Sequence, residues 1–163
     1  MQVLGIDPGI EITGFAIVNI TGPAQELVEC GVIRTPQEAT LPQRLNILAN
    51  DLEALLKQYP EIALASVEEL FFAKNVTTAF AVGQARGVVL YILERQGCPI
   101  RDVKPVEVKS IVTGAGNADK KDVQRIVQIL FKLDEVPKPD DAADAVAIAI
   151  AGAALHNQQQ RES

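Results

Sequence analysis

Two acidic residues each end an apolar segment of this chain. Asp7 follows Val3–Ile6 and Glu68 follows 63–67, so each carboxylate is expected at the end of a strand. A charge is costly to bury without a partner, and ligand sites gather at strand ends in mixed α/β sheets. The two carboxylates could therefore converge on one site. Alternatively, Asp7 caps its own turn, and alternation along the strand allows either Glu68 or Glu69 to face it.

A second pair of acidic residues lies near the end of the sequence. Asp141 and Asp144 are three residues apart, which places both on one face of a helix. Acidic residues also favour the first turn and the N-cap of a helix, so capping is the competing interpretation. Asp140 can serve as that cap and leave the pair free to bind metal.

Together these four carboxylates offer only hard oxygen ligands. Cys30 and Cys98 are far apart and lack CxxC spacing, and the sole histidine, His156, is near a polar end. Oxygen-only ligation suits Mg²⁺ or Mn²⁺ and not Zn²⁺. Four acids without a cation would repel one another. Two divalent ions about 4 Å apart would remove that repulsion and promote phosphoryl transfer.

Hydrophobic periodicity and turn residues predict the elements that must position these acids. Strands are expected over Gln2–Ile6, Thr13–Ile20, Glu26–Arg34, Ile62–Glu68 and Pro99–Val103, with the first three forming an antiparallel meander. Helices are expected over Leu41–Leu56, Val76–Gln96, Val106–Val112, Lys120–Leu133 and Ala142–Leu155. This order predicts an α/β fold, a mixed five-stranded sheet flanked by helices.

Charge is unevenly distributed along the chain. The net charge of −6 argues at first against a nucleic-acid partner. Residues 71–133, however, carry 10 basic and 5 acidic side chains, whereas residues 1–70 carry 3 and 10. Bound cations would offset the acids of the site, so the basic middle is compatible with DNA binding.

The sequence predicts a cytoplasmic protein with no membrane partner. No apolar run approaches the roughly 20 residues needed to cross a bilayer. Met1–Asp7 lacks the basic segment of a signal peptide and is expected to be a strand. We expect one domain over residues 1–156 and a polar, disordered tail over 157–163.

A stripe of small residues marks one helix. Ala79, Gly83 and Gly87 are spaced by four, and a glycine inside a helix costs about 1 kcal/mol relative to alanine. Such a stripe indicates that another backbone packs closely. That backbone is either the sheet of the same chain or a second copy at a dimer interface.

The ordered set of motifs resembles the RuvC family of Holliday-junction resolvases, whose core is RNase H-like (retroviral integrase-like). The resemblance covers nearly the whole chain and rests on the segments 5–9, 68–72, 74–76, 83–87, 108–109, 118–120, 140–145 and 147–149. It implies a metal-dependent endonuclease that resolves four-way DNA junctions by paired symmetric nicks in recombination and repair. The products would carry 5′-phosphate and 3′-hydroxyl ends.

The resemblance also implies roles for individual residues. The catalytic carboxylates, which would hold two Mg²⁺ ions or Mn²⁺ in their place, match Asp7, Glu68, Asp141 and Asp144; Glu68 is thus favoured over Glu69, with Asp140 as cap. Lys109 and Lys120 match basic catalytic residues. The residues expected to contact DNA are Phe71, Lys74, Lys109, Lys120 and Lys121. Such resolvases act as homodimers with the branch-migration proteins RuvA and RuvB, and Gly83 and Gly87 become candidates for the dimer interface.

Three other functions fit parts of the sequence. The loop 5–9 followed by Thr13-Gly14 also resembles the phosphate loop of actin-like ATPases and sugar kinases, but those folds need two such domains. An RNase H-like nuclease acting on RNA or RNA–DNA hybrids is a nearer alternative. A non-catalytic junction-binding module is the third.

Overall fold

The computed structural model describes residues 1–70 and 76–162, without the side chains of residues 76–78. Its elements in chain order are β1 (Gln2–Asp7), β2 (Ile12–Thr21), β3 (Ala24–Arg34), α1 (Leu41–Gln58), β4 (Ile62–Glu68), α2 (Val76–Arg95), β5 (Ile100–Val103), α3 (Pro105–Thr113), α4 (Lys120–Leu130) and α5 (Asp140–Glu162). Each element expected from the sequence is present, with ends that differ by a few residues. The largest difference is at α5, which begins earlier and ends later than expected.

The five described strands form one mixed sheet with the order β3-β2-β1-β4-β5. β1, β2 and β3 make the expected antiparallel meander, and β4 and β5 then add in parallel to β1. The central pair is β1 and β4, whose pairing ends at Ile6 and Val67. The chain therefore brings the carboxyl ends of two parallel strands together at the middle of the sheet, where Asp7 and Glu68 follow.

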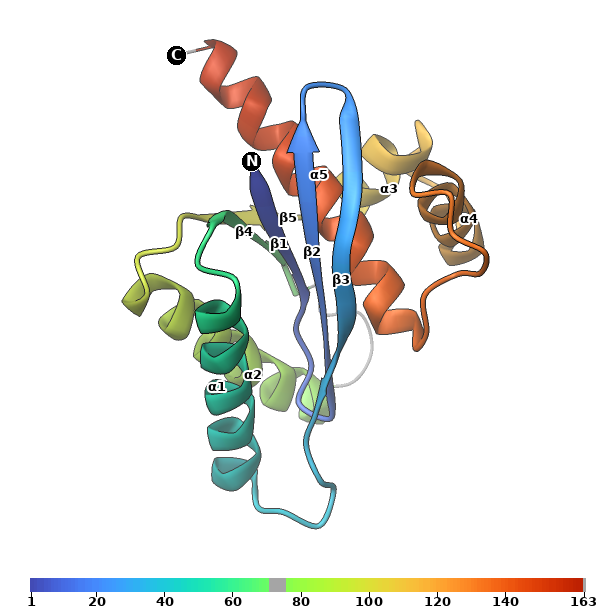
Figure 1. Ribbon diagram of the computed structural model, residues 1–163. Coiled ribbons are helices and arrows are strands. Elements are labelled where there is room, and N and C mark those ends of the chain that lie inside the picture. Colours follow the sequence, from blue (N-terminus) through green and yellow to red (C-terminus); the bar gives the residue numbers. More distant parts are fainter. Residues whose placement is uncertain (71–75, 163) are drawn as a thin grey trace.

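Helices cover both faces of the sheet (Figure 1), and each face has its own apolar core. On one face α5 crosses the strands, with α3 and α4 beside it. On the other face lie α1 and α2. Residues alternate between the two cores along β1: Val3 belongs to the α5 core, whereas Leu4 and Ile6 belong to the α1 and α2 core.

α5 lies unusually close to the sheet because its buried face is composed mainly of alanine. A Cβ added to Gly5 of β1 would overlap the carbonyl oxygen of Ala145. Farther along, the Ser66 hydroxyl of β4 donates to the carbonyl of Ile148 at 2.8 Å. These contacts fix the distance and the rotation of α5 relative to the two central strands.

Two expectations about α5 need correction. The helix continues through Glu162, so residues 157–162, which we expected to form a disordered tail, are helical. Asp140 is the first residue of the helix and not the residue before it. In the described part of the chain, no helix is both long and apolar enough to span a membrane.

Candidate active site

Asp7 lies on the α5 face of the sheet. Alternation along β1 places Val3, Gly5 and Asp7 on this face. Asp7 pairs with Gly14 of the neighbouring strand β2. The loop that follows Asp7 is held by Thr13, whose buried hydroxyl donates to the carbonyl of Gly9 at 2.6 Å. Asp7 is therefore held by a strand on one side and a tied loop on the other.

Glu68 lies on the same face. On β4, Leu64 packs in the α5 core and Ser66 bonds to α5, so alternation puts Glu68 on that face and Glu69 on the other. Strand alternation left the choice between these two glutamates open and the family resemblance favoured Glu68; the packing of the sheet places Glu68 on the α5 face. Because β1 and β4 pair in parallel up to Ile6 and Val67, Asp7 and Glu68 follow at adjacent strand ends on the same face of the sheet.

Asp141 and Asp144 lie in the first turns of α5, at the same end of the sheet. A Cβ added to Gly14 would overlap the carbonyl oxygen of Asp141, so β2 and the start of α5 are in direct backbone contact. Asp144 pairs with Lys120 of α4, with 2.8 Å between Oδ2 and Nζ. The structure thus brings all four expected carboxylates to one region from three separate elements.

Burial and the charges of neighbouring acids raise the pKa values of Asp7, Glu68 and Asp144. Burial, followed by the charges of Asp144 and Asp141, raises the pKa of Asp7 to about 7. Burial and the charges of Asp7 and Asp144 likewise raise the pKa of Glu68 to about 7. Burial also raises the pKa of Asp144, although Lys120 opposes that shift. The site therefore holds more negative charge than its surroundings stabilise.

Two lysines partly compensate this charge. Burial lowers the pKa of Lys120, but its hydrogen bond to Asp144 and the charges of Asp144 and Asp140 outweigh burial, so the pKa is raised. Asp140, expected to cap the helix, instead lies 3.5 Å from the Lys120 ammonium. Lys109 acts on Glu68 and lowers its pKa. Lys109 is carried by α3, whose start is closed by the Lys104 N–H donating to the Glu107 carboxylate at 2.7 Å.

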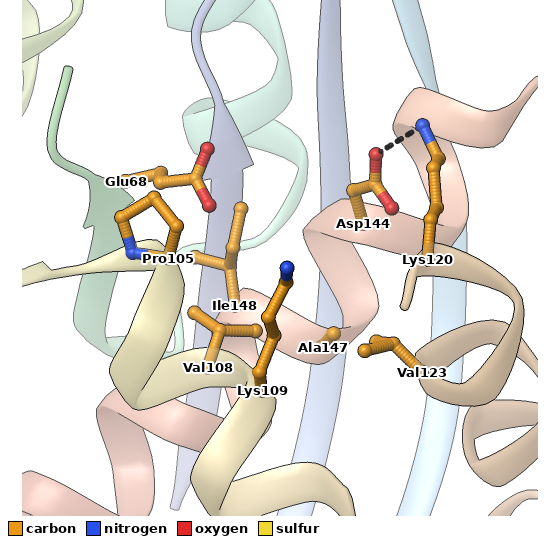
Figure 2. A pocket seen from close by; sticks show the side chains of 9 residues that line it. All are labelled: Glu68, Pro105, Val108, Lys109, Lys120, Val123, Asp144, Ala147 and Ile148. Atoms are coloured by element: carbon orange, nitrogen blue, oxygen red, sulfur yellow. Dashed lines mark ion pairs between the residues drawn. The ribbon is translucent and has the colours of Figure 1, made fainter. Parts of the chain in front are cut away.

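A pocket of about 170 Å³ opens between these groups (Figure 2). Its charged lining consists of Glu68, Lys109, Lys120 and Asp144, and an apolar floor is made by Pro105, Val108, Val123, Ala147 and Ile148. Figure 2 shows Lys109 between Glu68 and Asp144, with Lys120 paired to Asp144. The pocket therefore presents carboxylate oxygens, which are ligands for a cation, beside ammonium groups, which attract an anion.

The donor chemistry fits a hard divalent cation, because the acids of the site offer only carboxylate oxygens. In residues 1–70 and 76–162, no group of three or more Asp, Glu, His or Cys side chains is arranged so that it could hold a metal ion. Asp144 instead has the Lys120 ammonium as its counter-charge. Because the carboxylates repel one another, a divalent ion that drew them together would relieve an existing electrostatic cost.

The remaining residues expected to contact DNA or a second copy of the chain do not line the pocket in the described part of the structure. Phe71 and Lys74 lie outside the described residues. Lys121 is exposed on α4 next to Lys120, but it is not part of the pocket lining. Gly83 and Gly87 of α2 lie away from the pocket, on the helix that covers the opposite face of the sheet.

Several residues that build the site were not predicted to do so from the sequence. Thr13 ties the loop after Asp7, Gly14 admits Asp141, and Ser66 binds α5. Arg86, a basic residue of the segment 83–87 for which a structural role was an equal option, donates to the backbone carbonyl of Glu68. The small or polar residue two positions before each strand-end acid was the available signal for Gly5 and Ser66.

Comparison with known proteins identifies the family of this chain. Residues 3–152 match the family described as crossover junction endodeoxyribonuclease RuvC. The RuvC of Roseiflexus sp. is 48% identical over 149 residues, which cover 91% of this chain and 88% of that protein. The RuvC of Pseudothermotoga lettingae is 40% identical over 163 residues, the full length of both.

Solved structures give the same result for the fold. The structure described as T. thermophilus RuvC in complex with Holliday junction substrate has a TM-score of 0.91 and 31% identity, and the match covers 98% of this chain and 96% of that one. The RNase H-like fold expected from the motifs is thereby confirmed. The yeast mitochondrial Holliday junction resolvase Ydc2 shares the fold, with a TM-score of 0.68 at 15% identity. On the family match and on identities of 40% and above over most of its length, this chain belongs to the RuvC family of crossover junction endodeoxyribonucleases.

Proposed function

We propose that the chain resolves four-way DNA junctions by paired nicks in recombination and repair, with Asp7, Glu68, Asp141 and Asp144 as the metal ligands. The supporting observation is that two carboxylates at adjacent strand ends have pKa values raised to about 7 by burial and by one another's charge. Family membership supplies the substrate class, because a relative 31% identical is described in complex with a Holliday junction. Residues 1–156 would form a single nuclease domain.

The proposed cofactor is Mg²⁺, two ions for each site, with Mn²⁺ able to replace it. Bound ions would supply Lewis-acid stabilisation of the negative charge that builds up on the phosphate oxygens. In the reaction, water attacks phosphorus, the bond to the 3′ oxygen breaks, and that oxygen leaves as a hydroxyl. The four carboxylates would bind the ions and balance their positive charge. They would thereby fix the position of the scissile phosphate.

The lysines act on the DNA side of the pocket. Lys109 lies between Glu68 and Asp144, where its ammonium can contact a phosphate oxygen as charge develops on it (Figure 2). Lys120 holds Asp144 in place and offsets its charge. We expect Lys121, and also Phe71 and Lys74, to contact DNA outside the pocket. Stacking of an aromatic ring on an unpaired base is the role proposed for Phe71.

We also propose a homodimer formed through α2. Apart from the backbone of its own helix, no described atom lies within 4 Å of the place where a Cβ of Gly87 would stand, so Gly87 is not packed against its own sheet. A Cβ added to Gly83 would contact the Leu70 side chain at 3.8 Å. Phe80 and Tyr91, on the same side of the helix, are 71% and 61% exposed. A two-fold protein also suits a two-fold junction and paired nicks. From the family we also propose that this chain acts in the cytoplasm together with the branch-migration proteins RuvA and RuvB.

Cleavage of a synthetic four-way junction, with and without Mg²⁺, tests the proposal. The wild type should nick the junction symmetrically in Mg²⁺ and leave an RNA–DNA hybrid and a linear duplex intact. Asp7→Asn should bind the junction and fail to cut it, whereas Asp51→Asn, which changes an exposed carboxylate on α1, should cut normally. Preferred cutting of the hybrid, or binding without cutting by the wild type, would refute the proposal.

A further inference from the structure

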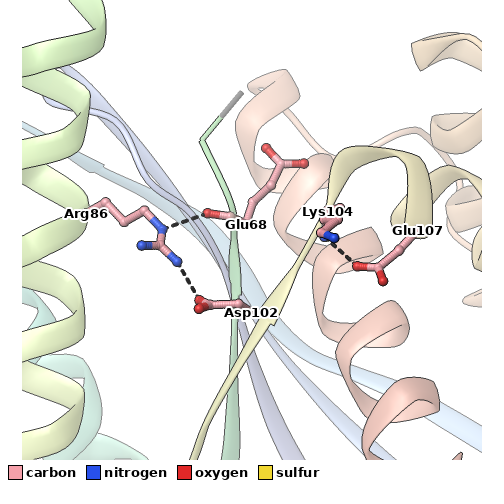
Figure 3. Close-up of polar contacts among 5 residues, drawn as sticks. All are labelled: Glu68, Arg86, Asp102, Lys104 and Glu107. Carbon is pink, nitrogen blue, oxygen red and sulfur yellow. Dashed lines mark hydrogen bonds and ion pairs between the residues drawn. The ribbon is translucent and has the colours of Figure 1, made fainter. Parts of the chain in front are cut away.

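Glu68 is the last residue of β4, and its backbone carbonyl accepts a hydrogen bond from an arginine of α2, the helix on the sheet face away from α5. Arg86 of α2 donates from Nε to the backbone carbonyl of Glu68 at 3.1 Å, and from Nη2 to Asp102 Oδ1 of β5 at 2.5 Å (Figure 3). A single guanidinium therefore ties α2 to the ends of two adjacent strands. Its side chain is only 18% exposed, which leaves it little contact with solvent or DNA.

The bond to the carbonyl matters because of the direction in which the Glu68 side chain leaves the backbone. Figure 3 shows the Glu68 carbonyl directed toward Arg86 and its carboxylate directed away, toward α5. Holding the carbonyl fixes the rotation of this peptide unit. Arg86 thereby constrains the direction of the Glu68 carboxylate through the backbone, although Arg86 is not among the residues that line the pocket.

This strand end needs such support. Pairing between β1 and β4 ends at Ile6 and Val67, one residue before Glu68. On the β5 side, the Glu69 N–H donates to the Val103 carbonyl at 2.8 Å. The carbonyl of Glu68 and the N–H of Glu69 are thus held by separate partners, at the point where the carboxylates of the site repel one another.

The ion pair with Asp102 fixes the guanidinium itself. Asp102 is adjacent to Val67 in the β4–β5 pairing, so its carboxylate comes from the strand next to the one being held. A planar guanidinium can donate in two directions at once, to the carbonyl and to this carboxylate. Lysine offers one ammonium at the end of a flexible chain and cannot keep both bonds in this geometry.

We infer that Arg86 is a positioning residue for metal binding, which orients Glu68 through its backbone carbonyl and is itself held by Asp102. The inference rests on the proposed role of Glu68 as a metal ligand. It assigns to Arg86 an effect on metal affinity and no contact with the reacting atoms.

The test is Mn²⁺ binding to the DNA-free protein, measured by titration calorimetry. Arg86→Gln should weaken Mn²⁺ binding about tenfold, the effect typical of losing a group that orients a metal ligand. Arg86→Lys should give an intermediate loss. Arg95→Gln is the matched control, because Arg95 lies on the same helix and also pairs with a carboxylate, Glu53 of α1. It should bind Mn²⁺ as the wild type does.

Two further measurements separate positioning from general destabilisation. Hydrogen exchange at the Glu69 amide should be faster in Arg86→Gln and unchanged in Arg95→Gln. Junction cleavage by Arg86→Gln should need more Mg²⁺ and approach the wild-type rate at saturating Mg²⁺. A loss of cleavage with unaltered Mn²⁺ affinity and Glu69 exchange would overturn the inference.

Should Arg86→Gln fail to fold, Asp102→Asn tests the same link. It removes the charge that holds the guanidinium and keeps the shape of the acceptor, so we expect about threefold weaker Mn²⁺ binding. An unchanged affinity in that variant overturns the inference. Glu68→Gln separates this from the proposed function: if Glu68→Gln still cuts junctions, the ligand assignment itself is wrong.

Discussion

Gly14 of β2 lies directly against the backbone carbonyl of Asp141, with no space for even one methyl group between strand and helix. Gly14 is also the residue that pairs with Asp7. One glycine therefore sets the separation between the strand that carries Asp7 and the helix that carries Asp141 and Asp144.

Gly14→Ala should move the start of α5 away from the sheet. A displacement of about 1 Å at a reacting centre can cost about a hundredfold in rate, so we expect a loss of that order in junction cleavage with junction binding retained. Gly31→Ala on β3 is the control, because the atoms nearest to its added Cβ belong to the side-chain ring of Phe15, at 3.1 Å, and not to the backbone of α5. Equal losses in both variants would show that Gly14 has no special relation to the site.

Lys120→Met should have opposite effects on metal binding and on cleavage. Without the ammonium, Asp144 is free to bind a cation and a nearby positive charge is gone, so Mn²⁺ affinity should rise several-fold. Junction cleavage should nevertheless fall about a hundredfold, because a cation near the reacting phosphate is lost. Lys138→Gln, which removes an exposed lysine paired with Glu135, should change neither quantity. Parallel losses of affinity and rate would instead indicate a structural role.

The stability of the metal-free protein should depend on pH in an unusual direction. The folded pKa of Asp7 is about 7, well above the unfolded value near 4, so between these values the folded state binds more protons than the unfolded state. The free energy of unfolding should then fall as the pH rises from about 4 to 7, by about 1 kcal/mol per pH unit for this group. Denaturant titration of wild type and Asp7→Asn at several pH values measures the difference in the free energy of unfolding. Its dependence on pH should disappear in saturating Mg²⁺, because Asp7 then stays ionised. A difference that does not change with pH would contradict the pKa assigned to Asp7.

Metal binding should follow the same titration. Asp7 and Glu68 must lose their protons to bind a cation, so Mn²⁺ affinity should increase up to about pH 7 and level off above it. Calorimetry in buffers of different ionisation enthalpy should detect proton release on binding near pH 6. An affinity independent of pH would show that these two carboxylates are not ligands.

Phe80→Glu should convert the proposed dimer to a monomer. The change puts a charge into the exposed apolar face of α2, where two copies would have to bury it. Ile129→Glu on α4 is the matched control, since Ile129 is also an exposed apolar residue, at 60%. Sedimentation velocity should show a dimer for the wild type and for Ile129→Glu. Dimers in all three proteins would place the interface elsewhere.

Much of the fold is determined locally and was predictable from the sequence. The order of strands and helices follows from hydrophobic spacing and turn residues, and each predicted element is present. The acids at residues 7 and 68 ended apolar segments, and the pair at 141 and 144 shared a helical face. These patterns depend on neighbours within a few residues, so the sequence alone displays them.

Only the tertiary structure decided which of these features meet. The choice of Glu68 over Glu69 depends on which face of the sheet α5 covers, and local alternation is the same for either face. The start of α5 at Asp140 and its pairing with Lys120 depend on how α4 packs beside α5. The hydrogen bond from Arg86 to the Glu68 carbonyl joins residues 18 positions apart, one on α2 and the other at the end of β4. Such contacts arise from the packing of distant segments, which no local pattern of residues encodes.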